Sequence, residues 1–263
     1  IKQQTQGEKD ASAAILEYDA LDRLTSYRKN GKTTTYTYDS FNRRLSKTVQ
    51  SASGAIASSI SYLYLGQNEI GSLDAKGKFI DFRVLGVGRG AEIGATVAIE
   101  LGTKTYAPLH DHNGNIVSFI DIQTGSVAEK YLYSAFGEEV IYSPRGTKLS
   151  ESALKNSWRF ASKRLDEESG LINFGRRFYD PATSRWISPD PLGFEAGPNL
   201  YAYVFNNPVS CIDLYGLEAA SLNASPANSR FGSFANNVAS TFRSGVNAVR
   251  NFGSAVKQSV VSS

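Results

Sequence analysis

The sequence predicts an all-β fold of repeated β-hairpins, followed by a C-terminal amphipathic helical tail. Three observations predict the hairpins. The segments YDALDRLTSY (18–27) and YDSFNRRLSKT (38–48) repeat after 20 residues, polar and apolar residues alternate along short runs, and Gly- or Asn-containing turns separate these runs. The composition agrees, since 11% of the residues are aromatic and 23 are glycines, which suit half-buried strands and turns.

The first region, residues 1–150, is predicted to be an array of hairpins. The Asp that follows each Tyr suits a turn, because its carboxylate can accept hydrogen bonds from nearby backbone N–H groups. The segments DAKGK, HNGN and QTGS are the strongest hairpin signals. We expect strands within the runs 59–65, 66–73, 74–86, 105–121 and 122–138.

The second region, residues 151–217, follows a polar stretch, 141–155, that we expect to form a loop. Strand and turn patterns resume over 157–187, where LINFGRRFY is typical of a strand and EESG and DPAT are typical of turns. The last 30 residues of the region are rich in Tyr and turn residues and have no helical period.

The third region, residues 218–263, differs in composition. Apolar residues recur every three or four positions over 234–260, which predicts an amphipathic helix there. The region has four basic residues and one acidic residue, so it carries the whole net charge of +3. We therefore expect no nucleic-acid partner for the core. The basic helix either binds an anionic membrane or packs its apolar stripe inside the protein.

Two near-copies of one phrase, DPLGF and DLYGL, begin at Asp190 and Asp213. Two carboxylates held close together resist double ionisation and share a proton. One of them can then deprotonate water while the other protonates a leaving amine. A structural role remains open, because Asp-Pro is a turn dipeptide and Asp213 could bind the N–H groups of a turn.

These segments resemble the Rhs/YD-repeat family. The resemblance is carried by YDALDRL, YDSFNRRL, HDHNGNIVSFID and YLYSAFGE, and most specifically by RRFYDPATSRWISPDPLGF and NLYAYVFNNPVSCIDLYGL. It extends over roughly the first 217 residues. The end of this stretch is similar to the family's repeat-associated core domain. Such chains resemble bacterial polymorphic toxins and the C subunits of insecticidal toxin complexes.

The resemblance implies a fold and an activity. Hairpins wind into a β-shell, partial in this chain, around a variable C-terminal segment that is carried as cargo. The core domain acts as an aspartic-type autoprotease that cuts after the final Gly-Leu, here at Leu217–Glu218. Asp190 and Asp213 are the implied catalytic pair, and Arg177 is implied to hold the carboxylates or the oxyanion.

The resemblance also implies partners and a location: delivery or toxin-complex subunits, and a secreted or cell-surface site in bacteria. From the residues alone, Arg177 could instead be an exposed strand cation or a partner of Asp180. Leu214 departs from the family pattern, which usually has Pro there to fix φ. The alternative function is therefore a non-enzymatic secreted or surface scaffold whose peptidase site is inactive.

The remaining residues suggest little further chemistry. We expect no cofactor, and no metal site at His110 and His112, since no third histidine exists to complete one. Cys211 is expected to be a small buried apolar residue. The chain begins at Ile1 and contains no Met, so we expect a piece of a longer protein.

Overall fold

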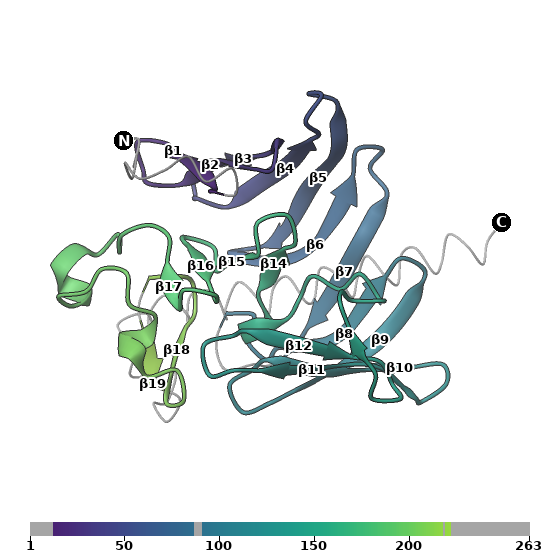
Figure 1. The fold of residues 1–263 in the computed structure, drawn as a ribbon. Coiled ribbons are helices and arrows are strands. Elements are labelled where there is room, and N and C mark those ends of the chain that lie inside the picture. The colour runs from purple at the N-terminus through teal and green to yellow at the C-terminus, as the bar shows by residue number, and fades with distance from the viewer. Residues whose placement is uncertain (1–12, 87–90, 218, 222–263) are drawn as a thin grey trace, which may run out of the picture. The chain divides into compact units, whose positions relative to one another are not determined.

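The structure is a computed structural model that describes residues 13–86, 91–217 and 219–221. Residues 15–149 form an antiparallel sheet of 13 strands, in which each strand pairs with the next along the chain (Figure 1). The strands are β1 (Ile15–Tyr18), β2 (Leu24–Lys29), β3 (Lys32–Tyr38), β4 (Arg44–Gln50), β5 (Ile56–Leu65), β6 (Asn68–Asp74), β7 (Phe79–Leu85), β8 (Thr96–Leu101), β9 (Lys104–His110), β10 (Ile116–Asp121), β11 (Val127–Tyr133), β12 (Glu139–Tyr142) and β13 (Lys148–Leu149). This order confirms the predicted array of hairpins.

Shorter elements follow the large sheet. An antiparallel sheet contains β14 (Arg164–Asp166), β15 (Leu171–Asn173), β16 (Phe178–Asp180) and β17 (Arg185–Trp186), and a final hairpin pairs β18 (Cys211–Asp213) with β19 (Ala219–Ser221). Three 3-10 helices are η1 (Phe160–Ser162), η2 (Gly193–Ala196) and η3 (Val204–Asn206). No α-helix occurs in the described ranges, so this part of the chain is all-β, as predicted.

The repeated Tyr-Asp segments form hairpin turns that the aspartate closes. Oδ1 of Asp19 accepts hydrogen bonds from the backbone N–H groups of Leu21 and Arg23, at 2.9 and 3.1 Å. Its Oδ2 accepts a third bond from Nε of Arg23, at 2.7 Å. The same set recurs at Asp39 in the next repeat, with Arg43 as the second cation. The carboxylate thus satisfies donors that the turn leaves without strand partners.

Other turns use the same arrangement with different side chains. Asp74 and Asp111 each accept bonds from the N–H groups two and four residues further on. Oγ of Ser143 accepts one from the N–H of Thr147, at 3.1 Å, in the turn between β12 and β13. The prediction of a loop over 141–155 is therefore wrong in its first half, because a serine replaces the aspartate that marks these turns.

Buried ion pairs join the first region to the second. Nη1 of Arg44 on β4 lies 2.7 Å from Oδ2 of Asp166 on β14, and both side chains are 0% exposed. The guanidinium of Arg164 donates two bonds to the carboxylate of Asp81 on β7, at 2.8 and 2.7 Å. The pairs belong to a larger network, since Glu69 also lies against Arg44 and Arg164 and Lys47 lies 3.7 Å from Asp166. Removal of one member would leave the other buried charges less well compensated. These pairs therefore specify how β14 packs on the large sheet.

An aromatic cluster fills the core of the second region. Phe174, Tyr179, Trp186 and Tyr203 are each at most 2% exposed and pack together with Phe160. The ring centroids of Tyr179 and Tyr203 lie 4.4 Å apart, and those of Phe174 and Trp186 lie 5.1 Å apart at a near-perpendicular angle. Large buried rings of this kind supply much of the apolar burial of a small core. The cluster fixes the strands that carry the candidate site.

The predicted tail helix over 234–260 lies outside the described residues. None of the helices that the structure does describe has the length and apolar character needed to cross a bilayer.

Candidate functional site

Arg177 immediately precedes β16, at the end of the turn that follows β15. Its side chain is 2% exposed, and its guanidinium carbon lies 4.2 Å from the ring centroid of Trp186. Nε donates to the carbonyl oxygen of Gly216, at 2.6 Å, and Nη1 donates to that of Leu200, at 3.4 Å. The buried aromatic ring and the carbonyls hold the guanidinium in one orientation, so that Nη2 faces the carboxylates.

Asp190 follows β17 and begins the segment DPLGF. Its Oδ1 accepts a bond from the N–H of Leu192, at 2.9 Å, which is the turn contact expected of an Asp-Pro segment. Its Oδ2 lies 2.7 Å from Nη2 of Arg177. One oxygen therefore orders the local turn, and the other makes a close ion pair.

Asp213 is the last residue of β18 and is 2% exposed. Its Oδ1 accepts bonds from three successive backbone N–H groups, those of Tyr215 (3.1 Å), Gly216 (2.6 Å) and Leu217 (3.1 Å). Its Oδ2 lies 3.5 Å from Nη2 of Arg177. The structure thus brings both aspartates to one nitrogen atom of Arg177.

The surroundings bias the charges of this group. Burial raises the pKa of the Asp213 carboxyl, although Arg177 and the three backbone N–H groups oppose the rise. Burial also lowers the pKa of Arg177, against the attraction of the two carboxylates. A guanidinium nevertheless stays charged in proteins. The site therefore places a guanidinium against two carboxylates, and that of Asp213 holds a proton more readily than usual.

The alternatives for Arg177 do not match its position. An exposed strand cation is excluded by its burial, at 3% exposure of the residue. Asp180 does not pair with it and instead accepts bonds within its own turn, from the N–H of Ala182 at 3.0 Å and the hydroxyl of Thr183 at 2.8 Å. The Asp213 side chain does bind turn N–H groups, as the structural interpretation of that residue predicts.

The turn after Asp213 differs from those of the Tyr-Asp repeats in where its aspartate lies. Asp19 lies inside its turn, where its N–H donates to the carbonyl of Arg23, whereas Asp213 is itself the last paired residue of β18, opposite Ala219. Within the turn after Asp213, the N–H of Leu217 donates to the Asp213 carboxylate. Glu218, on the far side of the predicted cleavage bond, lies outside the described residues. The two neighbours of Glu218 therefore both contact Asp213: Leu217 through its N–H and Ala219 through strand pairing.

Gly216 is required at its position in this turn. Its φ is +74°, in the left-handed region that side chains disfavour. A Cβ atom there would lie 3.0 Å from the backbone nitrogen of Arg177 and 3.4 Å from Cβ of Phe174. Only a residue without a side chain lets the turn approach the backbone of Arg177 this closely.

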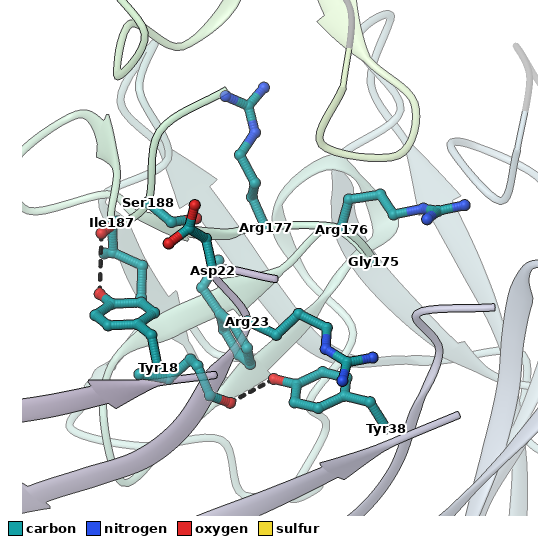
Figure 2. A pocket seen from close by; sticks show the side chains of 11 residues that line it. Tyr18, Asp22, Arg23, Tyr38, Gly175, Arg176, Arg177, Ile187 and Ser188 are labelled. Atoms are coloured by element: carbon teal, nitrogen blue, oxygen red, sulfur yellow. Dashed lines mark hydrogen bonds between the residues drawn. The ribbon is translucent and has the colours of Figure 1, made fainter. Parts of the chain in front are cut away.

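A pocket lies on the opposite side of the Arg177 backbone, against the first hairpin. Figure 2 shows Tyr18, Arg23 and Tyr38 around it, while the guanidinium of Arg177 extends away from them. The Tyr18 hydroxyl donates to the carbonyl of Ile187, at 2.9 Å, and so fastens the first hairpin to the second region. The pocket is thus separate from the carboxylates and belongs to the packing between the two regions.

The sequence predicts no metal site at His110 and His112, which lie at the end of β9 and just after it. Within the residues that the structure describes, no three His, Cys, Asp or Glu side chains are grouped to hold a metal ion. Cys211 is half-buried and packs against the aromatic cluster, so it is less enclosed than expected.

Comparison with known proteins decides the family. A family model described as RHS Repeat matches residues 17–56, the two Tyr-Asp turns and the strands around them. The tRNA nuclease WapA of Bacillus subtilis (strain 168) is 31% identical over 205 residues, which covers 74% of this chain. The chain belongs to the Rhs/YD-repeat family.

Relatives of this Rhs chain include proteins named as toxins. The toxin protein Tse5 of Pseudomonas aeruginosa is 48% identical over 59 residues, 22% of this chain and 4% of Tse5. The crystal structure of TcdB2-TccC3 is similar in fold, with a TM-score of 0.58 at 23% identity, over 78% of this chain and 10% of that one. This Rhs chain spans about 8% of the length of WapA.

Sequence reasoning missed one residue of this Rhs site. Nζ of Lys163 donates to the carbonyl oxygen of Leu214, at 2.6 Å, inside the turn that follows Asp213. It also lies 2.9 Å from Oε1 of Glu92. The two contacts span 51 and 71 residues of chain, and the surrounding sequence gives no local signal for them.

Proposed function

We propose that this chain is the C-terminal part of an Rhs/YD-repeat toxin-type protein that encloses its own C-terminal segment and releases it by autoproteolysis at Leu217–Glu218. One observation carries the proposal. Oδ2 of Asp190 and Oδ2 of Asp213 lie 2.7 and 3.5 Å from the same nitrogen of Arg177, beside the turn that contains Leu217. Two carboxylates beside a peptide bond can serve as the base and the acid of its hydrolysis, and a cation beside them can stabilise the oxyanion.

The proposed roles follow from the contacts of each carboxylate. Asp190, in the closer ion pair with Arg177, acts as the base and removes a proton from water as the water oxygen attacks the carbonyl carbon of Leu217. Arg177 stabilises the resulting oxyanion. Asp213 supplies a proton to the nitrogen of Glu218, and the C–N bond breaks to give a carboxylic acid at Leu217 and a free amine at Glu218.

The environment of Asp213 supports its role as the acid. Burial raises the pKa of its carboxyl, which favours the protonated form. Oδ1 already accepts three N–H bonds, so the proton belongs on Oδ2. A single proton shared within the aspartate pair would give the reaction an acidic limb and a basic limb in its pH profile.

The proposal includes the wider organisation of the protein. Residues 1–150 form the YD-repeat array, 151–217 the repeat-associated core, and 218–263 the cargo, with its helix at about 234–260. The array would close into a shell together with repeats outside this chain. Location at the cell surface or in the medium, and assembly with delivery or toxin-complex subunits, are part of the same proposal.

A second candidate function rests on a specific observation. The three N–H bonds to Oδ1 of Asp213 resemble the turn-closing bonds of Asp19 and Asp39, which have a structural role. On this interpretation the aspartates only shape turns, and the chain is a secreted or surface scaffold that does not cut itself. Leu214, in place of the usual Pro, is consistent with this alternative.

Intact mass after expression with the native upstream sequence separates the two functions. Autoproteolysis predicts a released segment of residues 218–263, lost in Asp190→Asn and in Asp213→Asn. Asp180→Asn is the matched control, because Asp180 closes a nearby turn without touching Arg177. An unbroken chain in the unsubstituted protein would contradict the proposal, and equal release from all four chains would contradict the assigned residues.

A further inference from the structure

Lys163 is a buried cation that binds the turn containing the proposed cleavage bond. Its side chain is 1% exposed, and Nζ donates to the Leu214 carbonyl at 2.6 Å and to Oε1 of Glu92 at 2.9 Å. Nζ also lies 5.6 and 5.5 Å from the ring centroids of Phe174 and Tyr215. A buried ammonium with two oxygen acceptors and two ring faces is held in one place.

The backbone before Lys163 is fixed in an unusual conformation. Ala161 and Ser162 have φ of +50° and +54°, which is strained for residues with side chains. The N–H of Ala161 donates to Oδ1 of Asn115, at 2.7 Å, and the Ser162 hydroxyl donates to the carbonyl of Gly114, at 2.7 Å. Such strain persists only where surrounding contacts enforce it. These contacts direct the side chain of Lys163.

The Ser162 carbonyl gives a second point of attachment. It accepts a bond from Nη1 of Arg83 on β7, at 2.9 Å. Arg83 is buried by Trp158, with its guanidinium carbon 3.5 Å from a ring centroid. The segment that carries Lys163 is therefore bound both to the turn between β9 and β10 and to β7 of the large sheet. A rigid base of this kind lets one side chain position a distant loop.

The backbone at residue 214 lacks the constraint that a proline would supply there. Leu214 has no ring to fix φ, so its backbone has more freedom than a proline would have there. The hydrogen bond from Lys163, which lies outside the turn, restricts the backbone conformation of Leu214 because it fixes the position of the Leu214 carbonyl oxygen. Leu214 itself packs against the aromatic cluster, which restricts its side chain as well.

We propose that Lys163 is a positioning residue for autoproteolysis, and that its bond to the Leu214 carbonyl replaces the constraint that a proline at 214 would supply. The inference rests on the proposed function, because the position of this turn affects release only if the Leu217–Glu218 bond is cleaved. Lys163 contacts neither Asp190 nor Asp213 in the described structure. It acts only through the turn.

The kinetic test compares release of residues 218–263 in two variants with release in the unsubstituted chain. Lys163→Met is expected to slow release about 10²-fold, the scale of a displacement of about 1 Å near reacting atoms. Lys47→Met is the control, because Lys47 is a similarly buried lysine that pairs with Glu168 and Asp166 and does not touch the turn. The control should release at close to the native rate.

The rescue distinguishes positioning from general stability. Adding Leu214→Pro to Lys163→Met should restore release to at least about tenfold above the single variant, because the ring fixes φ where the lysine no longer holds the carbonyl. A merely structural role predicts no rescue. Equal release rates for Lys163→Met and the control, or no recovery in the double variant, would overturn the proposal.

A second readout does not depend on cleavage. In a chain carrying Asp190→Asn, which keeps Asp213 and leaves the turn uncut, Lys163→Met should raise amide hydrogen exchange at Tyr215, Gly216 and Leu217. The control Lys47→Met should not. Unchanged protection in Lys163→Met would refute the contact itself. If the unsubstituted chain releases no tail while this exchange result holds, the proposed function fails and the positioning of the turn stands.

Discussion

Gly216 gives a direct test of how closely the cleavage turn must approach Arg177. The substitution Gly216→Ala adds a Cβ atom at φ +74°, 3.0 Å from the Arg177 nitrogen and 3.4 Å from its Cβ. The left-handed conformation alone costs an alanine about 1–2 kcal/mol. The overpacked contact adds about 1–3 kcal/mol, because backbone atoms must move to relieve it.

Gly170 offers a matched control. Its φ is also +74°, but a Cβ atom there would meet nothing within 4 Å. Gly170→Ala therefore loses only the conformational part, about 1–2 kcal/mol, whereas Gly216→Ala loses about 2–5 kcal/mol in the free energy of unfolding. Urea denaturation measures both values, and the difference between them isolates the contact with Arg177.

The same pair of variants tests the site. A shift of Arg177 by a few tenths of an ångström should lengthen its contacts with both aspartates, so tail release should slow by about 10- to 100-fold in Gly216→Ala and little in Gly170→Ala. Equal destabilisation of the two variants would refute the packing argument. Equal release rates would refute the claim that the turn must lie against Arg177.

Three further predictions concern the repeats, the join between regions and the tail. Burial opposes ionisation of Asp39, but its hydrogen bonds from Arg43 and Phe41 lower its pKa overall, so its stabilising contribution is present above about pH 4 and is lost as the pH falls. The loss in free energy of unfolding caused by Asp39→Asn, measured by urea denaturation, should therefore shrink between pH 6 and pH 3. A loss that stays constant over this range would contradict the assignment. Asp81→Asn should lower the free energy of unfolding by about 1.5–3 kcal/mol, because it weakens the charge-assisted bonds to buried Arg164, which keeps Glu69 as a second partner, whereas Lys104→Gln, at a 61% exposed side chain, should change it by less than about 1 kcal/mol; equal losses would refute the assignment. If the tail acts on membranes, a peptide of residues 218–263 should release dye from anionic vesicles and not from neutral ones, and absence of binding to anionic vesicles would exclude that role.

The parts of the fold that the sequence predicts are those set by local contacts. The Tyr-Asp turns are recognisable because Asp19 and Arg23 close the turn within five residues of chain. Ser143 accepts an equivalent bond from the N–H of Thr147, but the sequence does not indicate it, because serine is common in ordinary loops and carries no charge to pair with a following arginine. Local geometry with a different side chain therefore misled the prediction over 141–155.

The candidate site depends on contacts that no local pattern contains. Arg177 binds the Gly216 carbonyl across 39 residues, and Lys163 binds the Leu214 carbonyl across 51. The family resemblance singled out Arg177 and both aspartates, and the structure brings the three together. It could not indicate Lys163, whose role depends on a strained turn held by Asn115 and Gly114.

The mass of the chain after expression tests the central claim most directly. Autoproteolysis at Leu217–Glu218 predicts two species, one ending at Leu217 and one of residues 218–263, heavier in total than the precursor by one water. Asp190→Asn and Asp213→Asn should each give only the uncut mass, and Asp180→Asn should give both fragments. A single uncut species from the unsubstituted chain, folded and with its native upstream sequence, would contradict autoproteolysis and favour the scaffold.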